Sequence, residues 1–463
     1  MAGNKIPHDT TGAVLLPDGR VAYPTPAAAW YTVAILFMFY WLSILDRLVI
    51  SLLVKPIRHD LHITDFELSL LQGFAFGVFY AICGMPLGWL VDRVSRRRII
   101  YFGVTIWSFA TFSCGLARNY FQLFLCRVGV GAGEASLSPA AYSLLADSFP
   151  PQKLTLAVTI FGLGSIIGTG MAYALGGMVV ELASKSDAVI LPLIGEIHPW
   201  QLVFMVIGMP GVLLALLAFT LREPLRRLEK KTSVGEGAGR SFREEIGDMR
   251  QFIASHKRFF IFHHAGFTMG LAALTGFALW YPAYMSRSFG WSPAQIGLWL
   301  GLFYCAGGLI GAPLSGWLID RLFARGLKDA HMRVYMYAAL VATPICIFAV
   351  TGNNPWIFLC MVTLMQICIG SVASVGNATL QIVAPSHLRG RLAALYLFIS
   401  ILLGIGLGPS LVAAVTDFVF HDDNMLGASL SLVAIILLPL SAIMFRLGQA
   451  PMRVAVDAMH ARG

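Results

Sequence analysis

Four charged side chains lie inside stretches that are otherwise apolar, namely Asp46, Arg47, Arg127 and Glu134. A charge near the centre of a membrane helix costs roughly 2.5–3.5 kcal/mol on insertion scales. These side chains must therefore pair with one another or line a water-filled cavity. Arginine stays charged at physiological pH and binds anions, whereas a carboxylic acid can take up and release a proton. Together the four residues predict a site that binds an anion and exchanges protons.

Helical geometry places most of these residues on shared faces, with Asp46 about 100° round the helix from Arg47. Arg127 and Glu134 are about two turns apart on one face, and Tyr40, Ser43 and Arg47 likewise share a face. The two polar faces are expected at matching depth, which predicts one wall of an aqueous cavity. The alternative is a structural charge cluster that only holds two helices together.

Composition and apolar runs define the elements that carry these residues. The 463-residue chain is 57% hydrophobic and only 12% charged, against roughly a quarter charged in a soluble domain. Runs of about 17–25 apolar residues are long enough to span a membrane. We therefore predict an all-α integral membrane protein with twelve transmembrane helices, near 30–54, 67–91, 99–117, 120–145, 155–180, 200–221, 257–285, 294–319, 333–351, 355–382, 392–416 and 426–447.

A hexapeptide occurs twice, about half the chain length apart. Residues 88–93 read G-W-L-V-D-R and residues 316–321 read G-W-L-I-D-R. Such a repeat is typical of transporters built from two related halves. We expect two pseudo-symmetric six-helix bundles, joined by a cytoplasmic linker with an amphipathic helix. The expected segments are an N-terminal tail 1–29, bundles 30–221 and 257–447, the linker 222–256 and a C-terminal tail 448–463.

Basic residues predict the orientation of these helices. If both termini are cytoplasmic, the inner segments hold 26 of the 33 lysines and arginines and the outer loops hold 5. An excess of this size on one side predicts the cytoplasmic side. The outer loops contain no N-x-S/T sequon, which favours a bacterial inner membrane.

The first hexapeptide continues into G-x-x-x-D-R-x-x-R-R, which resembles the signature loop of the major facilitator superfamily. Its residues are Gly88, Asp92, Arg93 and Arg97, and the second copy supplies Asp320 and Arg321. Ser95 stands where the family usually has glycine. The resemblance implies that Asp92 contacts the eleventh span and that Asp320 contacts the fifth.

Two further segments, 44–47 (I-L-D-R) and 127–136 (R-V-G-V-G-A-G-E-A-S), look like the spinster branch of that superfamily. The resemblance is clear over about 40–180 and weaker after 257. It implies a bacterial homologue of transporters associated with lysophospholipids and sphingosine 1-phosphate. It also implies that Arg47 and Arg127 face the substrate or its charged partner, and that Asp46 and Glu134 belong to a proton-responsive network.

The second bundle is expected to supply a more apolar and aromatic cavity wall. Any single aromatic residue is more often a packing residue than a ligand contact. The candidates, which join Tyr40 and Ser43 of the first bundle, are Trp280, Tyr281, Tyr284, Tyr304, Gln366 and Asn377.

These features predict a secondary active transporter with alternating access. The expected cargo is a small amphiphile, lysolipid-like and phosphate-bearing, moved with proton coupling. A drug or metabolite exporter of the same superfamily is the first alternative.

A lipid-modifying membrane enzyme is the second alternative. The sequence lacks G-x-S-x-G and H-E-x-x-H motifs, so we expect no enzyme activity, no metal site and no cofactor other than the coupling proton. The expected partners are the substrate and membrane lipids, without nucleic acid, and the expected assembly is a monomer.

Overall fold

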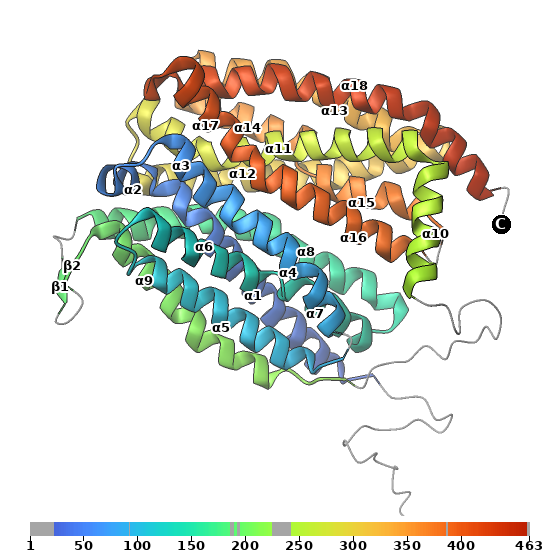
Figure 1. Ribbon diagram of the computed structural model, residues 1–463, viewed down its shortest axis with the longest axis horizontal. Helices are drawn as coiled ribbons and strands as arrows, with labels where there is room; N and C mark the ends of the chain where they lie inside the picture. The colour runs from blue at the N-terminus through green and yellow to red at the C-terminus, as the bar shows by residue number, and fades with distance from the viewer. Residues whose placement is uncertain are drawn as a thin grey trace, which may run out of the picture.

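Figure 1 shows a bundle of long helices that run along one common axis. The computed structural model describes residues 23–91, 93–185, 189–191, 195–224, 242–385 and 388–460. Besides helices, these residues form one antiparallel hairpin of β1 (Val189–Leu191) and β2 (Gly195–Ile197). The hairpin lies at one end of the bundle and the chain's last helix ends at the other (Figure 1).

We call these two ends the hairpin end and the linker end. The hairpin end carries β1, β2 and the short helix α2 (Val54–Leu61). The linker end carries α10 (Phe242–Ser255), which crosses the end of α11 in Figure 1. Phe252 of α10 packs edge-on against Phe260, with the ring centroids 5.9 Å apart.

Six membrane-length helical segments form the first half of the chain. They are α1 (Pro26–Leu52), α3–η1–α4 (Asp65–Ser69, Leu70–Phe74, Ala75–Val91), α5 (Arg96–Cys114), α6–α7 (Tyr120–Glu134, Leu137–Ser148), α8 (Pro151–Ser184) and α9–η2 (Pro199–Leu214, Ala215–Thr220).

Six more form the second half. They are α11 (Lys257–Phe289), α12 (Pro293–Ala324), α13 (Ala330–Thr351), α14–α15 (Pro355–Ile369, Val372–Val383), α16–η3–α17–η4 (Arg389–Ile399, Ser400–Ile405, Gly406–Val415, Thr416–Phe420) and, after η5 (Asp423–Met425), α18 (Leu426–His460).

The predicted all-α architecture is confirmed. Ten of the twelve segments are apolar enough over a sufficient length to cross a membrane. The other two are α5, which begins with three arginines, and α6–α7, which is interrupted after Glu134. The last helix is longer than the predicted span because it continues past the apolar stretch. There Arg453 bonds to buried Asp329 of the α12–α13 loop at 2.7 Å.

Local sequence signals explain where helices begin. Thr64 and Glu67 form a capping box at the start of α3, and Ser292 and Gln295 form one at the start of α12. In each case the hydroxyl of the cap residue accepts a hydrogen bond from the backbone N–H of the third helical residue. The side chain of that third residue accepts one from the backbone N–H of the cap residue. Pro293 occupies the first turn, where its missing N–H costs nothing.

Ion pairs between the two bundles close the hairpin end. Arg287 of α11 donates from both Nη atoms to the Asp65 carboxylate of α3, at 2.7 Å each. Arg58 of α2 lies 3.0 Å from the same carboxylate and 2.5 Å from that of Asp423. At the linker end, the ion pairs around Arg96, Asp329 and Asp457 that the described residues form each join residues from one half of the chain. The bundles are therefore tied together by charge at the hairpin end.

A glycine contact also brings the two bundles close together. A Cβ added at Gly73 in η1 would lie 2.7 Å from the carbonyl oxygen of Gly406 and 2.9 Å from that of Ile405. Both obstructing atoms belong to backbone, which cannot move away as a side chain would. The π-helical turn η1 therefore packs against α17 only because residue 73 has no side chain.

We expect Gly73→Ala to destabilise this conformation by about 1–3 kcal/mol, the usual cost of overpacking. Gly84→Ala is the matched control, because a Cβ at Gly84 meets no atom within 4 Å and alanine favours the helix. Thermal unfolding in one detergent should give a lower midpoint for Gly73→Ala than for Gly84→Ala. Equal midpoints would contradict the close contact between η1 and α17.

Candidate functional site

Arg47 and Glu134 form an ion pair where α1 packs against α6. Arg47 donates from Nη2 to Oε2 of Glu134 at 2.5 Å. The guanidinium also lies over the ring of Phe76, 4.4 Å from its centroid, and 5.8 Å from that of Tyr80. The Arg47 side chain is 21% exposed, whereas that of Glu134 is 1% exposed. The arginine of this pair is thus partly exposed, whereas its glutamate is buried.

Arg127 is held by backbone carbonyls and has no exposed surface. Its Nε donates to the carbonyl of Leu71 and its Nη1 donates to the carbonyl of Asp46, each at 3.2 Å. Leu71 belongs to the π-helical turn η1, and such turns are frequent at functional sites. Arg127 therefore fastens α6 to both α1 and η1.

Asp46 is fully buried, and neither of its carboxylate oxygens has a hydrogen-bond partner among the described residues. Thr111 and Trp107 of α5 are its polar side-chain neighbours, and Arg127 and Glu134 are its charged ones. A buried polar group without a partner is a place where proteins hold water.

A residue that sequence reasoning missed, Gln72, adds to this polar interior. It is 1% exposed, and both of its amide atoms are buried without a partner among the described residues. Nη2 of Arg127 and Oε1 of Glu134 are unpartnered in the same way. A glutamine within the apolar run at 67–91 was the available signal.

Glycines on α6 let its neighbours come close enough to build the site. A Cβ at Gly131 would lie 3.1 Å from the Cα and carbonyl carbon of Phe76. A Cβ at Gly133 would lie 2.7 Å from the backbone nitrogen of Trp107. The glycines between Arg127 and Glu134 thus allow α4 and α5 to approach the face that carries the charges.

The structure brings together the four charged residues predicted from sequence, and places the other first-bundle candidates beside them on α1. Tyr40 stacks on Phe161 of α8, with centroids 5.0 Å apart. The hydroxyl of Ser43 donates to the carbonyl of Tyr40. A direct role in substrate binding stays a prediction for both.

The aromatic candidates of the second bundle are packed inside its hairpin end. The Trp280 indole donates to the Pro409 carbonyl at 2.9 Å, and the Tyr284 hydroxyl donates to the Val350 carbonyl at 3.2 Å. Tyr281 is also buried. In this conformation these side chains contribute to the hydrophobic core, and their role as ligand contacts stays a prediction.

Tyr304 and Gln366 lie nearer the interface between the bundles. The ring of Tyr304 lies 6.1 Å from that of Tyr173 on α8, whose hydroxyl donates to the Ala278 carbonyl of α11 at 2.7 Å. Oε1 of Gln366 and Oδ1 of Asn377 are buried without a partner among the described residues. Tyr173 was missed because a lone tyrosine in a glycine-rich helix carries no distinguishing pattern.

The repeated hexapeptides end in the same local contact in both halves. The guanidinium of Arg93 lies 3.8 Å from the ring centroid of Trp89, and that of Arg321 lies 5.2 Å from Trp317. A Cβ at Gly88 would meet no atom within 4 Å. Asp92 lies outside the described residues, and Asp320 is exposed. The expected contacts of these two aspartates with the eleventh and fifth spans stay predictions.

The basic loop after the first hexapeptide is held by an acidic residue that sequence reasoning missed. Glu223 accepts hydrogen bonds from the Ser95 hydroxyl and from the Arg96 backbone at 2.7 Å, and pairs with Arg97 at 3.4 Å. Arg96 is buried and also pairs with Asp147. Although partial burial opposes ionisation, the hydrogen bonds from Ser95 and Arg96 hold the pKa of Glu223 below its usual value.

Comparisons with known proteins agree with this architecture. The model of the Major Facilitator Superfamily matches residues 36–409. An MFS-type efflux pump of Mycolicibacterium smegmatis is 26% identical over 438 residues, 92% of this chain and 94% of that protein. Protein spinster homolog 1 of Homo sapiens is 27% identical over 429 residues, 86% of this chain and 75% of that protein.

A solved structure has the same fold. It is the crystal structure of a bacterial homolog of the human lysosomal transporter Spinster, in an inward-facing and unoccupied conformation. Its TM-score is 0.72 at 22% sequence identity, covering 94% of this chain and 98% of that chain.

We expect Glu223→Gln to lower the free energy of unfolding by about 1–2 kcal/mol at neutral pH, because charge-assisted hydrogen bonds are lost. A carboxylate whose pKa is lowered by folding stabilises the fold at every pH above its pKa in the unfolded chain, about 4.3. That stabilisation is lost as the pH falls through the pKa of the folded state. The difference between wild type and variant should therefore shrink in acid, as measured by thermal unfolding at pH about 7 and about 4. The control is Glu196→Gln, at an exposed glutamate of β2. A difference that is constant with pH would contradict the role of Glu223.

Proposed function

The chain belongs to the major facilitator superfamily and is a multi-pass membrane transporter; from that premise we propose that it moves a small amphiphile with an anionic head group, of the lysolipid class, in a proton-coupled cycle. The pair of Arg47 and Glu134 is the observation that carries this proposal. It combines a partly exposed cation, which can bind an anion, with a buried acid, which can hold a proton.

The head-group part of the proposal rests on the chemistry around Arg47. A guanidinium suits phosphate and carboxylate geometry and remains charged at any physiological pH. Phe76 and Tyr80 flank this guanidinium and offer apolar surface beside it. A ligand that is charged at one end and apolar beyond it would match both features.

The proton part of the proposal rests on competition for Arg47. Ionised Glu134 occupies the guanidinium of Arg47 in the 2.5 Å ion pair. A proton on Glu134 would cancel the attraction and free Arg47 for the head group of the cargo. Asp46 would extend the proton-binding site, because a buried acid without a hydrogen-bonding cation costs less free energy when it is neutral.

The proposed cycle places the hairpin end outside the cell. The basic-residue count supports this orientation, with both termini in the cytoplasm of a bacterium whose inner membrane holds the protein. The ion pairs at the hairpin end support a state whose site would be reached from the cytoplasm, and the rocking of two bundles would then alternate exposure. The protein would act as a monomer that needs no cofactor beyond protons.

A second candidate cargo class is a drug or metabolite. The likeness to an MFS-type efflux pump over 92% of the chain favours it. The same Arg47 site would then bind a smaller anion or an anionic drug. A lipid-modifying enzyme is disfavoured, because the superfamily as a whole consists of transporters.

The test is uptake by proteoliposomes, measured for labelled lysophospholipids and for a panel of anionic drugs, with and without a pH step. We expect uptake to fall about tenfold or more in Arg47→Ala, since a charge-assisted contact with the cargo is lost. We expect the Glu134→Gln variant still to bind the cargo. Its uptake should no longer change with the pH step, because residue 134 no longer titrates.

Arg118→Ala, at an exposed arginine of the hairpin end, is the control and should behave as wild type. Undiminished uptake in Arg47→Ala would overturn the assignment of the head-group site. A normal pH response in Glu134→Gln would overturn the coupling. Uptake of drugs but of no lysolipid would select the second candidate cargo.

A further inference from the structure

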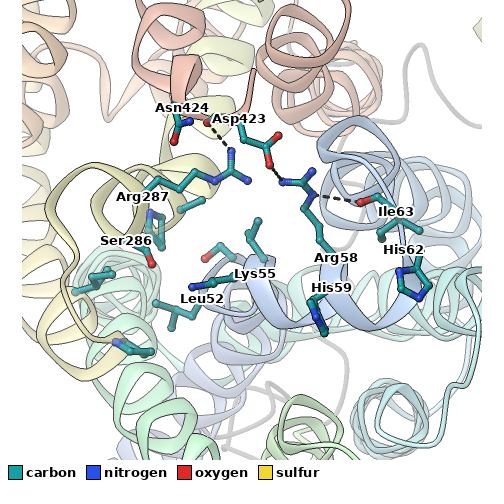
Figure 2. Close-up of a pocket in the computed structure, with 16 residues that line it drawn as sticks. Leu52, Lys55, Arg58, His59, His62, Ile63, Ser286, Arg287, Asp423 and Asn424 are labelled. Atoms are coloured by element: carbon teal, nitrogen blue, oxygen red, sulfur yellow. Dashed lines mark hydrogen bonds and ion pairs between the residues drawn. The ribbon is translucent and has the colours of Figure 1, made fainter. Parts of the chain in front are cut away.

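A second polar cavity lies at the hairpin end, apart from the Arg47 site. Figure 2 shows it between α2 of the first bundle and α11 of the second, with the loop that precedes α18 above it. Its volume is about 540 Å³, within the usual range for small-ligand sites. None of the residues of the proposed transport site lines it.

Cationic side chains from both bundles line this cavity. Lys55 and Arg58 come from the first bundle and Arg287 comes from the second. Lys55 is exposed, forms no ion pair with a described residue, and has its side chain directed into the cavity in Figure 2. Asp423 is the single acid among the lining residues, and its side chain is 50% exposed. Directly behind the arginines lie the carboxylates of Asp65 and Asp417, so the arginines are balanced by acids and Lys55 is the cation of this cavity that pairs with none of the described acids.

The two arginines keep hydrogen-bonding capacity for a ligand. Arg58 donates through Nε to the Ile63 carbonyl and through Nη1 to Asp423. Arg287 donates through its two Nη atoms, to Asp65 and to the Asp423 carbonyl. Nη2 of Arg58 and Nε of Arg287 make no hydrogen bond with a described residue. An anion placed beside Lys55 could accept from these free N–H groups.

The remainder of the lining is mixed, with seven apolar residues and five polar ones, the latter being Ser51, His59, His62, Ser286 and Asn424. A free inorganic anion gains nothing from the apolar residues, whereas the first methylene groups of an alkyl chain gain by leaving water. The apolar lining residues are Leu52, Val54, Ile63, Pro282, Ala283, Pro293 and Ile296.

We propose that this cavity binds the anionic head group of an amphiphile at the outer face, as a site separate from Arg47. The proposal rests on the proposed function, because it assigns the same cargo class to a second place on its route. Lys55 supplies the free charge, Arg58 and Arg287 supply directed donors, and the apolar lining receives the start of the chain.

Binding there acts on the contact between the bundles. The head group competes with Asp423 for Arg58, whereas Asp65 is buried and stays bound to Arg287. An anion in the cavity therefore replaces the exposed half of the ion-pair network and leaves the buried half intact. Cargo outside the cell would thereby weaken the contact between Arg58 and Asp423, which helps to hold the hairpin end closed.

The experiment measures binding of hexyl phosphate to the full-length protein in nanodiscs, in an Arg47→Ala background that removes the first site. Hexyl glucoside, with the same chain and no charge, and inorganic phosphate, with no chain, are the comparison ligands. We expect hexyl phosphate to bind more tightly than either and to weaken as salt is added.

Two variants in this background test the residues in opposite directions. Lys55→Gln should weaken hexyl phosphate binding roughly threefold to tenfold, the effect of losing one solvent-accessible charge contact. Asp423→Asn should tighten it, because a competing anion is removed. Lys185→Gln is the matched control, at a lysine of the same end that pairs with Glu181 outside the cavity, and it should change nothing.

Unchanged affinity in Lys55→Gln, or weaker binding in Asp423→Asn, would overturn the proposal. Equal affinity for inorganic phosphate would overturn the assignment to an amphiphile. These results are independent of the Arg47 test: lost uptake in Arg47→Ala together with unaltered Lys55→Gln binding would refute the outer site alone. Normal uptake in Arg47→Ala with weakened Lys55→Gln binding would refute the transport site alone.

Discussion

The complete burial of the Arg127 guanidinium constrains the rest of the first bundle. A charge in that position needs acceptors, and it obtains them from the backbone carbonyls of Leu71 and Asp46 rather than from a carboxylate. Those carbonyls lie on η1 and α1, so α6 must pack tightly against both. Gly131 lets α6 approach α4, the continuation of η1, because a side chain there would collide with the backbone of Phe76. The position of one charge thus fixes how three helices pack.

This constraint separates fixed charges from exchangeable ones. Arg127 has no exposed surface and bonds to backbone, so its partners cannot change without moving a helix. Arg47 bonds to a side chain and is partly exposed, so its partner can change by a proton or a ligand. The turn η1 links the fixed charge to the contact between the bundles: Leu71 accepts from Arg127, and Gly73 lies against Gly406. The turn η1 therefore carries one of the two acceptors of Arg127 as well as the contact with α17.

The sequence sufficed to predict the helical segments and the meeting of the four charges, because apolar length and helical period are local properties. It did not suffice to predict which groups would pair. Asp65 and Arg287 lie in different bundles. Helical periodicity shows which residues share a face of one helix, but not which other helix packs against that face. The role of η1 was also hidden, since a π-helical turn leaves an apolar run unbroken. Glu223 was missed because its partner, the Arg96 backbone, carries no signal in the sequence.

The two halves share helices and hexapeptides, yet their interiors differ. In the described residues, ion pairs within the second bundle lie at the linker end, around Asp329 and Asp457. Within the first bundle, by contrast, Arg47 of α1 pairs with Glu134, a buried residue at the end of α6. A cargo with one charged end and one apolar end has the same asymmetry. If the first bundle binds the head group and the second receives the alkyl chain of the cargo, rocking of the bundles brings together or separates a charged surface and an apolar one. Only the charged surface then needs to respond to protons.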